Sequence, residues 1–195
     1  MQVVLTKSVN FKTKNELRER IVGLLKNQKE DERFKKSFII QKKLFMLREF
    51  KDAHVILFYA SFDGEVDTLK MIKETQKLGK RIALPKINKR KKIFTPILVE
   101  SVDEDLQIGP FGIKEPKETT GNALDINRLD MVVVPGLAFD SFNYRIGRGG
   151  GYFDRFLEIL PKSIPSVGLA FDFQMVDSIP QRQKHDLPVS YVLFN

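Results

Sequence analysis

The sequence predicts an α/β protein, a three-layer α/β/α arrangement in which a largely parallel sheet is flanked by helices on both faces. Apolar runs typical of buried strands alternate with segments of helical periodicity through the middle of the chain. The chain has 195 residues, of which 42% are hydrophobic and 30% charged, so it can bury a core. We expect a single domain over 1–195, with N-terminal helices within 14–50 packed on an α/β body over 53–195.

The expected helices follow from apolar periodicity and from signals at their ends. Thr13 and Glu16 have the spacing of a capping box, in which the Thr hydroxyl accepts from the Glu amide and the Glu side chain reaches back. Gly79 is the expected end of a later helix, because glycine adopts the left-handed conformation that ends many helices. The expected helices are 14–27, about 31–50, 65–78 and about 151–161.

Buried strands are expected wherever a short apolar run is bounded by turn residues. The expected strands are 54–61, 81–85, 93–99, 131–134, 166–171 and 188–194. Residues 100–122 are acidic and rich in glycine and proline, so we expect a long connecting loop with room for one helical turn. The acid-free run 86–92 is expected to be a basic turn between two strands.

Composition excludes several classes of protein. Cysteine is absent, which excludes a disulfide scaffold, a thiolate zinc site and a cysteine nucleophile. No apolar run approaches the ~20 residues of a membrane span, and the start of the sequence does not have a signal-peptide profile. We therefore expect a cytoplasmic monomer that does not associate with membranes.

Positive charge is concentrated in the N-terminal third. The formal net charge is +8, and residues 12–51 alone hold 13 Lys or Arg against 6 Asp or Glu. Three interpretations are open: a polyanionic small substrate attracted by the field, a nucleic acid, or a solvated surface without a partner. The aromatic-interleaved strand of an RNA-recognition module is missing, which argues against nucleic acid.

The most informative segment is Arg145–Asp154, which connects an expected buried strand to an expected helix. Its glycines are Gly147, Gly149, Gly150 and Gly151. Glycine lets backbone amides approach an anion closely, and the helix start adds partial positive charge. Arg145 and Arg148 can donate to phosphate oxygens, and Asp154 could hold Mg²⁺ against those phosphates. We interpret the segment as a phosphate-binding loop; the alternative is a solvated glycine turn.

The same segment resembles a known family. The stretches 135–140 (PGLAFD) and 145–157 (RIGRGGGYFDRFL) are similar to the signature of the 5-formyltetrahydrofolate cyclo-ligases, also called 5,10-methenyltetrahydrofolate synthetases. Three further segments agree with this family in order and spacing: 14–18, the strand–helix–strand segment 59–85, and His185-Asp186. The resemblance therefore covers nearly the whole chain.

The resemblance implies an enzyme that converts 5-formyltetrahydrofolate and ATP to 5,10-methenyltetrahydrofolate, ADP and phosphate, with Mg²⁺. It implies that the formyl oxygen attacks the γ-phosphate, and that N10 then closes the ring as phosphate leaves. Such a reaction depends on alignment of the two reactants and on neutralisation of charge during transfer. The partners would be small molecules, ATP and a folate that could carry several glutamates, and not nucleic acid.

The resemblance also implies roles for individual residues. The implied catalytic residues are Arg145 and Asp154. The implied ATP-binding residues are Lys14, Arg18, Arg145, Gly147, Arg148, Gly149, Gly150, Gly151, Tyr152 and Phe153. The implied folate-binding residues are Phe62, Glu65 and Tyr152, of which Glu65 would accept hydrogen bonds from the pterin ring. The implied Mg²⁺ ligands are Asp154 and Asp186.

Other interpretations of these residues remain open. The structural alternatives are solvated charge for Lys14 and Arg18, a helix-start or turn role for Glu65, Asp154 and Asp186, and a place in the core for Phe62 and Tyr152. We expect Arg145 and Asp154 to lie in exposed loop or helix-start positions. The alternative functions are a basic nucleic-acid-binding module and a sugar-phosphate or acyl-transfer enzyme on a related α/β fold, since a fold does not set a function.

Overall fold

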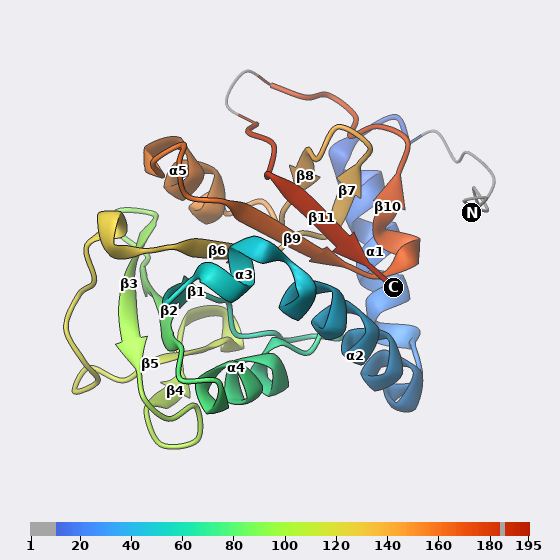
Figure 1. Cartoon of the computed structure of the whole chain (residues 1–195). Coiled ribbons are helices and arrows are strands. Elements are labelled where there is room, and N and C mark those ends of the chain that lie inside the picture. The colour runs from blue at the N-terminus through green and yellow to red at the C-terminus, as the bar shows by residue number, and fades with distance from the viewer. Residues whose placement is uncertain (1–10, 184–185) are drawn as a thin grey trace.

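The computed structural model describes residues 11–183 and 186–195, and a six-stranded sheet forms the centre of the described chain (Figure 1). The strand order is β11-β9-β6-β1-β2-β3. The strands are β1 (Val55–Leu57), β2 (Arg81–Asn88), β3 (Ile93–Val99), β6 (Met131–Val134), β9 (Ser166–Ala170) and β11 (Tyr191–Phe194). Neighbouring strands are parallel except β2 and β3, which are antiparallel. The predicted α/β class with a largely parallel sheet is confirmed.

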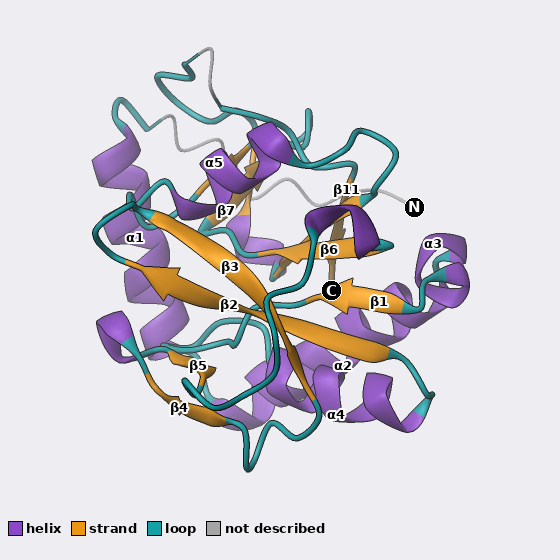
Figure 2. Cartoon of the chain, turned by 90° about the vertical axis from the view of Figure 1, so that its left-hand side faces the viewer, coloured by secondary structure: helices purple, strands orange, loops and turns teal. Residues whose placement is uncertain are grey.

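Helices cover both faces of this sheet (Figures 1 and 2). They are α1 (Lys14–Asn27), α2 (Glu30–Met46), α3 (Arg48–Asp52), α4 (Thr68–Lys77) and α5 (Tyr152–Ile159). Successive residues of a strand point to opposite faces. Met131 and Val133 therefore lie in one core with α1, α2 and α4, whereas Val132 and Val134 lie in a second core with α5. The predicted three layers are present.

Helix α1 has the bounds that the sequence predicted. Thr13 accepts from the amide of Glu16 and the Glu16 side chain bonds back to the Thr13 amide, which completes the capping box. Leu17, Ile21 and Leu25 are buried against the sheet. Packing of this face fixes the rotation of the helix, and the polar residues between these positions are thereby directed away from the core.

Two predicted helices have different bounds in the structure. The helix expected over about 31–50 is interrupted at Leu47, whose backbone is extended (ψ 138°). The interruption changes the direction of α3, so that Phe50 is buried and stacks on Phe45. The helix expected over 65–78 begins only at Thr68, because the side chain of Asp67 caps it. Gly79 follows this helix with φ 77°, as predicted.

Several expected strands also differ. The strand expected over 54–61 ends at Leu57, the strand over 81–85 continues to Asn88, and the last strand begins at Tyr191. Residues 100–122 are not a simple loop: they form the hairpin of β4 (Leu106–Ile108) and β5 (Lys114–Pro116), with the 3-10 helix η1 (Pro110–Gly112) between the strands. Strands of three residues are too short to be detected from alternation of apolar residues.

A second small sheet lies beside the amino-terminal helix (Figure 1). It contains β10 (Met175–Val176), β7 (Ala138–Asp140) and β8 (Arg145–Ile146), in that order. The remaining 3-10 helices are η2 (Ile126–Arg128) and η3 (Asp172–Gln174). The sequence did not predict β7 and β8 as strands, yet they form an antiparallel pair and the glycine segment begins in β8.

Two further sequence predictions concern membrane-spanning helices and His185. Within the described residues, no helix is long and apolar enough to cross a membrane. His185, which precedes Asp186 in one of the segments similar to the family, lies outside the described residues.

Close packing around the fully buried ring of Phe139 gives a test of the fold. A Cβ at Gly168 of β9 would overlap this ring. We expect Gly168→Ala to lower the free energy of unfolding by about 1–3 kcal/mol, because the ring cannot move without disturbing its neighbours. Urea denaturation measures the change.

The matched control is Gly23→Ala in α1, where an added Cβ has nothing within 4 Å. We expect this variant to be more stable by about 0.5–1 kcal/mol, because alanine favours a helix interior over glycine. Equal stability of the two variants would contradict the assignment of Phe139 to a tightly packed core.

Candidate functional site: a glycine loop beside an apolar pocket

The glycine segment lies between strand β8 and helix α5. Gly149 (φ 98°) and Gly151 (φ 68°) adopt left-handed conformations that other residues rarely take, so glycine is required at these two turns. Among the described residues, the amides of Gly149, Gly150 and Gly151 donate to no protein atom. Backbone amides of this kind at the start of a helix can donate to an anion, so anion binding by this loop stays a prediction.

Arg145 is the first residue of β8, directly before this loop, and is almost entirely buried. Its Nη2 donates to Oδ1 of Asp154 at 2.9 Å, and its Nε has no hydrogen-bond partner among the described residues. Burial lowers the pKa of the guanidinium, and the carboxylates of Asp154 and Asp186 oppose this shift. The prediction that Arg145 lies in an exposed position is wrong, because only 2% of its side-chain surface is exposed. Asp154 is partly buried in the first turn of α5.

Helix α1 contributes one cation to this loop and a second cation to Asp186. Nε of Arg18 donates to the carbonyl of Gly147 at 3.0 Å, and Nζ of Lys14 forms an ion pair with Oδ2 of Asp186 at 2.6 Å. Lys14 and Arg18 are four residues apart and lie on one helical face, so both can reach one anion. Asp186 also accepts from the amide of Gln183, which holds its carboxylate in place.

An apolar pocket of about 290 Å³ lies on the other side of the glycine loop. The predicted site residues that line it are Phe62, Glu65, Arg145, Gly147, Arg148, Gly150, Gly151, Tyr152, Phe153 and Asp154. Lys14, Arg18, Gly149 and Asp186 do not line it. Most of the predicted residues thus line one pocket, whereas Lys14 and Arg18 come from α1 outside its lining, and Arg145 and Asp154 border both regions.

Glu65 and Arg148 form an ion pair at one wall of the pocket. Nε and Nη2 of Arg148 donate to Oε1 of Glu65 at 3.2 and 3.1 Å, Nη1 contacts Asp63, and the guanidinium lies 4.2 Å from the centre of the Phe62 ring. Burial raises the pKa of Glu65 to about 7, although Arg148 opposes the shift. Glu65 precedes α4 and is not part of it, so its expected alternative role as a helix-start carboxylate does not apply.

The remaining predicted pocket residues are aromatic. Tyr152 meets the ring of Phe111 edge-on at 6.1 Å between centroids. Phe153 packs on Phe94, with centroids 4.9 Å apart, and reaches both the core and the pocket wall. These rings give the pocket a surface suited to a flat, partly apolar molecule.

The carboxylates near Arg145 fit a divalent cation that is bound together with a polyphosphate. Asp154 is hydrogen-bonded to Arg145, and the charge of Asp186 also acts on this guanidinium, so both carboxylates lie near Arg145. Within the described chain there is no group of three or more residues with the ligand set of a protein-only metal site. Mg²⁺ is usually held by one or two carboxylates and by substrate phosphates, so two carboxylates are sufficient for it.

The sequence did not identify several residues of the pocket. The missed lining residues include Tyr59, Pro85, Ile87, Phe111, Ile113, Lys114 and Glu115. They come from the segment after β1, from β2 and from the β4–β5 hairpin, and no local motif marks them. Arg155 was also missed: its Nη2 donates to the carbonyl of Gly150 at 2.7 Å and its Nε donates to the carbonyl of Lys92 at 2.6 Å.

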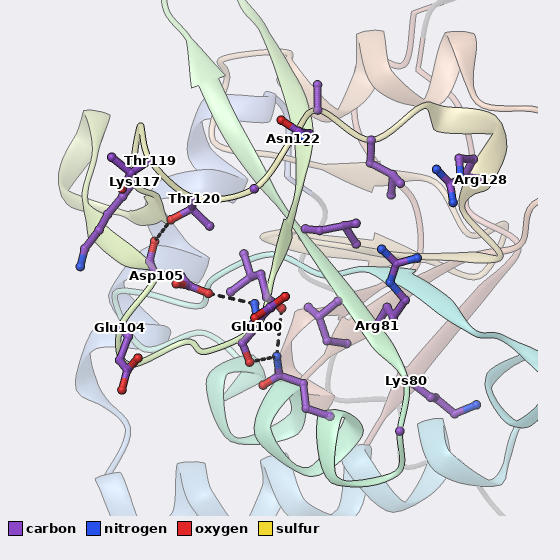
Figure 3. Close-up of a pocket in the computed structure, with 18 residues that line it drawn as sticks. Lys80, Arg81, Glu100, Glu104, Asp105, Lys117, Thr119, Thr120, Asn122 and Arg128 are labelled. Carbon is purple, nitrogen blue, oxygen red and sulfur yellow. Dashed lines mark hydrogen bonds between the residues drawn. The ribbon is translucent and has the colours of Figure 1, made fainter.

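A larger hollow, of about 1010 Å³, lies elsewhere on the molecule beside the start of β2 (Figure 3). It contains none of the predicted site residues. Its polar groups bond to one another: Thr120 donates to the carbonyl of Asp105, and the carboxylate of Asp105 accepts from the amides of Glu100 and Ser101. Since parallel sheets bind ligands at the carboxyl ends of their strands, the smaller pocket is the candidate site.

These features define a class: an α/β protein in which a glycine loop and buried arginine suited to a phosphate adjoin a pocket suited to a small, flat molecule. The model of the 5-formyltetrahydrofolate cyclo-ligase family matches residues 10–195, and the chain belongs to this family. The resemblance seen in the sequence is confirmed.

Individual relatives agree with this assignment. The chain is 36% identical to the 5-formyltetrahydrofolate cyclo-ligase of Haemophilus influenzae over 75% of this chain and 79% of that protein. It is 28% identical to the mouse protein of the same name over 100% of this chain and 97% of that protein. The solved structure of Aquifex aeolicus 5,10-methenyltetrahydrofolate synthetase covers 93% of this chain, and 89% of that chain is matched, with a TM-score of 0.80 and 34% identity.

The raised pKa of Glu65 predicts a pH-dependent stability. The folded protein keeps a proton on Glu65 up to about pH 7, whereas the unfolded chain releases it near pH 4.5, so this group favours folding at low pH and the contribution is lost as pH rises through 7. From pH 4 to 8, we expect the free energy of unfolding to fall, relative to Glu65→Gln, by on the order of 3 kcal/mol.

Urea denaturation of both proteins at several pH values measures this difference. The matched control is Glu104→Gln, which replaces an exposed carboxylate outside the pocket and should follow the unmodified chain. Parallel pH profiles for the unmodified chain and Glu65→Gln would show that the pKa of Glu65 is not raised.

Proposed function

We propose that the protein converts 5-formyltetrahydrofolate and ATP to 5,10-methenyltetrahydrofolate, ADP and phosphate. The observation that carries the proposal is the position of the glycine loop, which is hydrogen-bonded to Arg18 of α1 and also lines the apolar pocket. A phosphate donor on one side and a flat acceptor on the other can meet at this loop. Alignment of the two reactants supplies much of the rate enhancement in such transfers.

The proposed chemistry has two steps. In the first, the formyl oxygen attacks the γ-phosphorus of ATP, the bond from this phosphorus to the ADP oxygen breaks, and an imino-phosphate forms. In the second, N10 attacks the formyl carbon, N10 loses its proton, the carbon–oxygen bond breaks and phosphate leaves. Phosphorylation is needed because an amide oxygen is otherwise a poor leaving group.

The cationic side would hold the triphosphate. Arg18 and Arg145 lie beside the glycine loop, Lys14 lies beside Asp186, and the unpartnered Nε of Arg145 is a donor for a phosphate oxygen. In the free protein, Lys14 is paired with Asp186 and Arg145 with Asp154. Nucleotide binding would exchange these partners, so that the phosphates receive the cations.

The same exchange would leave Asp154 and Asp186 for Mg²⁺, which neutralises phosphate charge when it is bound. The protein's own cations complete this neutralisation, because Arg145 is held beside the loop: it belongs to strand β8, and only 2% of its side-chain surface is exposed. A fixed charge that is already in position when the reaction begins needs no reorganisation. Arg145 and Asp154 are therefore the residues on which transfer should depend most.

The apolar pocket would hold the pterin part of the folate. Tyr152 and Phe62 offer aromatic surfaces, and Glu65 offers a carboxyl group to the ring nitrogens. A pKa of about 7 lets Glu65 act as a hydrogen-bond acceptor or donor near neutral pH. Arg148 is paired with Glu65 in the free protein, and its exposed position allows it to move towards the nucleotide when folate takes its place.

Product formation tests the proposal directly. We expect the protein to form 5,10-methenyltetrahydrofolate from 5-formyltetrahydrofolate only when Mg²⁺ and ATP are both present, measured by the near-ultraviolet absorbance of the methenyl product. Asp154→Asn should reduce kcat by about a hundredfold or more, because loss of one charge that supports transfer typically costs several kcal/mol. Absence of product in the complete mixture would refute the proposed function, and an ATP-independent product would refute the phosphorylation step.

Arg18 supplies a second test, with a matched control on the same helix. Arg18→Ala removes a donor that faces the glycine loop, and we expect the KM for ATP to rise about tenfold or more, because hydrogen bonds to charged groups contribute ~1.5–3 kcal/mol. Arg20→Ala removes an exposed arginine of α1 that is not in contact with the loop and should leave this KM unchanged. Equal effects of the two changes would mean that α1 contributes only general positive charge.

A further inference from the structure

The phenol hydroxyl of Tyr59 is a polar group that neither the fold nor the proposed reaction uses. Tyr59 follows β1, lines the apolar pocket and has only 6% of its surface exposed. Its backbone carbonyl accepts from the hydroxyl of Thr68 at 2.6 Å, but its own hydroxyl has no hydrogen-bond partner among the described residues. A buried tyrosine hydroxyl normally has a partner, because an unpaired one costs free energy. The missing partner of Tyr59 is therefore expected to come from a ligand.

The hydroxyl can be reached from the pocket. In the described chain, the fully enclosed side-chain oxygen and nitrogen atoms without a partner are Oε1 of Gln28 and Nε of Arg145. The hydroxyl of Tyr59 is not one of these, so it is not fully enclosed. The ring packs in the core on one side, and the hollow that Tyr59 lines is the pocket. A ligand in the pocket can therefore contact the hydroxyl.

The segment that carries Tyr59 is held firmly at the end of a central strand. Oγ1 of Thr68 donates to Tyr59 and accepts from the amide of Ser61, and the amide of Thr68 donates in turn to the Ser61 hydroxyl. Strand β1 lies between β6 and β2, and ligands of parallel sheets bind at the carboxyl ends of the strands. The hydroxyl is thus positioned before any ligand arrives, which reduces the cost of binding.

Tyr59 is a donor that lies near an acceptor. Burial and the carboxylates of Glu65 and Asp67 raise the pKa of Tyr59 well above its usual range, so the hydroxyl keeps its proton at neutral pH. Asp67 is occupied as the cap of α4 and does not line the pocket. Glu65 does line it, and its carboxyl group is the acceptor proposed for the ring nitrogens. The wall of the pocket therefore offers a donor and an acceptor side by side.

This pair is complementary to one edge of a pterin ring. In the pyrimidine half of the ring, the N3–H group lies between the 2-amino group and the C4 oxygen. A carboxylate that accepts from N3 and from the 2-amino group leaves the C4 oxygen as the neighbouring acceptor. The formyl oxygen is not available to Tyr59, because the proposed reaction places it against the γ-phosphate of ATP.

We propose that the hydroxyl of Tyr59 donates a hydrogen bond to the C4 oxygen of the pterin ring, so that the enzyme selects 4-oxo folates over 4-amino folates. The inference rests on the proposed function, since it assumes that the ring of 5-formyltetrahydrofolate occupies the pocket. An amino group at C4 has no lone pair in the ring plane to accept from the hydroxyl. A site with a buried polar group rejects an analogue that leaves this group unpaired.

The test removes the hydroxyl and keeps the ring, in the variant Tyr59→Phe. The matched control is Tyr191→Phe, which removes a phenol hydroxyl that donates to Glu49 outside the pocket. Two quantities are measured in the presence of Mg²⁺ and ATP. They are the KM for 5-formyltetrahydrofolate and the inhibition constant of its analogue with an amino group in place of the C4 oxygen.

We expect Tyr59→Phe to raise the KM for 5-formyltetrahydrofolate about fivefold, the effect of one lost hydrogen bond between neutral groups, and to change kcat and the KM for ATP far less. The inhibition constant of the analogue should stay the same or fall, so the preference for the 4-oxo ring decreases about fivefold. Tyr191→Phe should leave both quantities unchanged.

Three results would overturn the inference. An unchanged KM would show that the hydroxyl contacts no part of the substrate, and equal increases for substrate and analogue would show that it does not distinguish the C4 oxygen. A fall in kcat at unchanged KM would place the hydroxyl at the reacting formyl group instead.

Stability separates this function from a structural one. Tyr59→Phe removes an unpaired polar group from the free protein, so urea denaturation should show a variant at least as stable as the unmodified chain. A less stable variant would mean that the hydroxyl has a partner within the protein, which contradicts the inference.

The two proposals fail in different ways. If the unmodified chain forms product and Tyr59→Phe has the same KM, the assignment of Tyr59 is wrong and the proposed function stands. If the unmodified chain forms no product, the proposed function is wrong and the assignment of Tyr59 is refuted with it.

Discussion

The buried guanidinium of Arg145 is the constraint on which the site depends. An unpaired charge in the interior is costly, so the fold must surround it with compensating groups. The structure does so with the carboxylate of Asp154, in direct contact, and with that of Asp186 at longer range. Both carboxylates sit on segments that the rest of the fold brings together: the first turn of α5 and the approach to the last strand.

The position of Arg145 explains why the glycine loop borders both the cations of α1 and the apolar pocket. The buried side chain of Arg145 lies close to Gly147 at the start of the glycine loop, and Gly149 and Gly151 adopt left-handed turns further along it. Arg18 is hydrogen-bonded to the loop from the α1 side, and Arg155 from the side of the hairpin. The loop is therefore held by two hydrogen bonds to its carbonyl groups, while the amides of Gly149, Gly150 and Gly151 donate to no atom of the described residues.

Sequence reasoning succeeded where the signal was local. The capping box and apolar periodicity of α1, the acid-free turn of the β2–β3 hairpin and the glycine segment before α5 can all be recognised within a dozen residues. It failed where a distant contact decided the outcome. Glu65 precedes its helix because Asp67 caps it, the helix expected up to residue 50 breaks so that Phe50 can enter the core, and Arg145 is buried by elements far from it in sequence.

The sequence by itself therefore determined the family and the class of the fold: which family the motif resembles and which runs form the sheet. These properties follow from residue type and short-range spacing. Tertiary structure alone decided that Phe111 would line the pocket, that Glu65 would have its pKa raised to about 7, and that Lys89 of the basic turn would lie beside the Phe111 ring. Burial and proximity depend on the packing of segments that are tens of residues apart, and no local pattern encodes them.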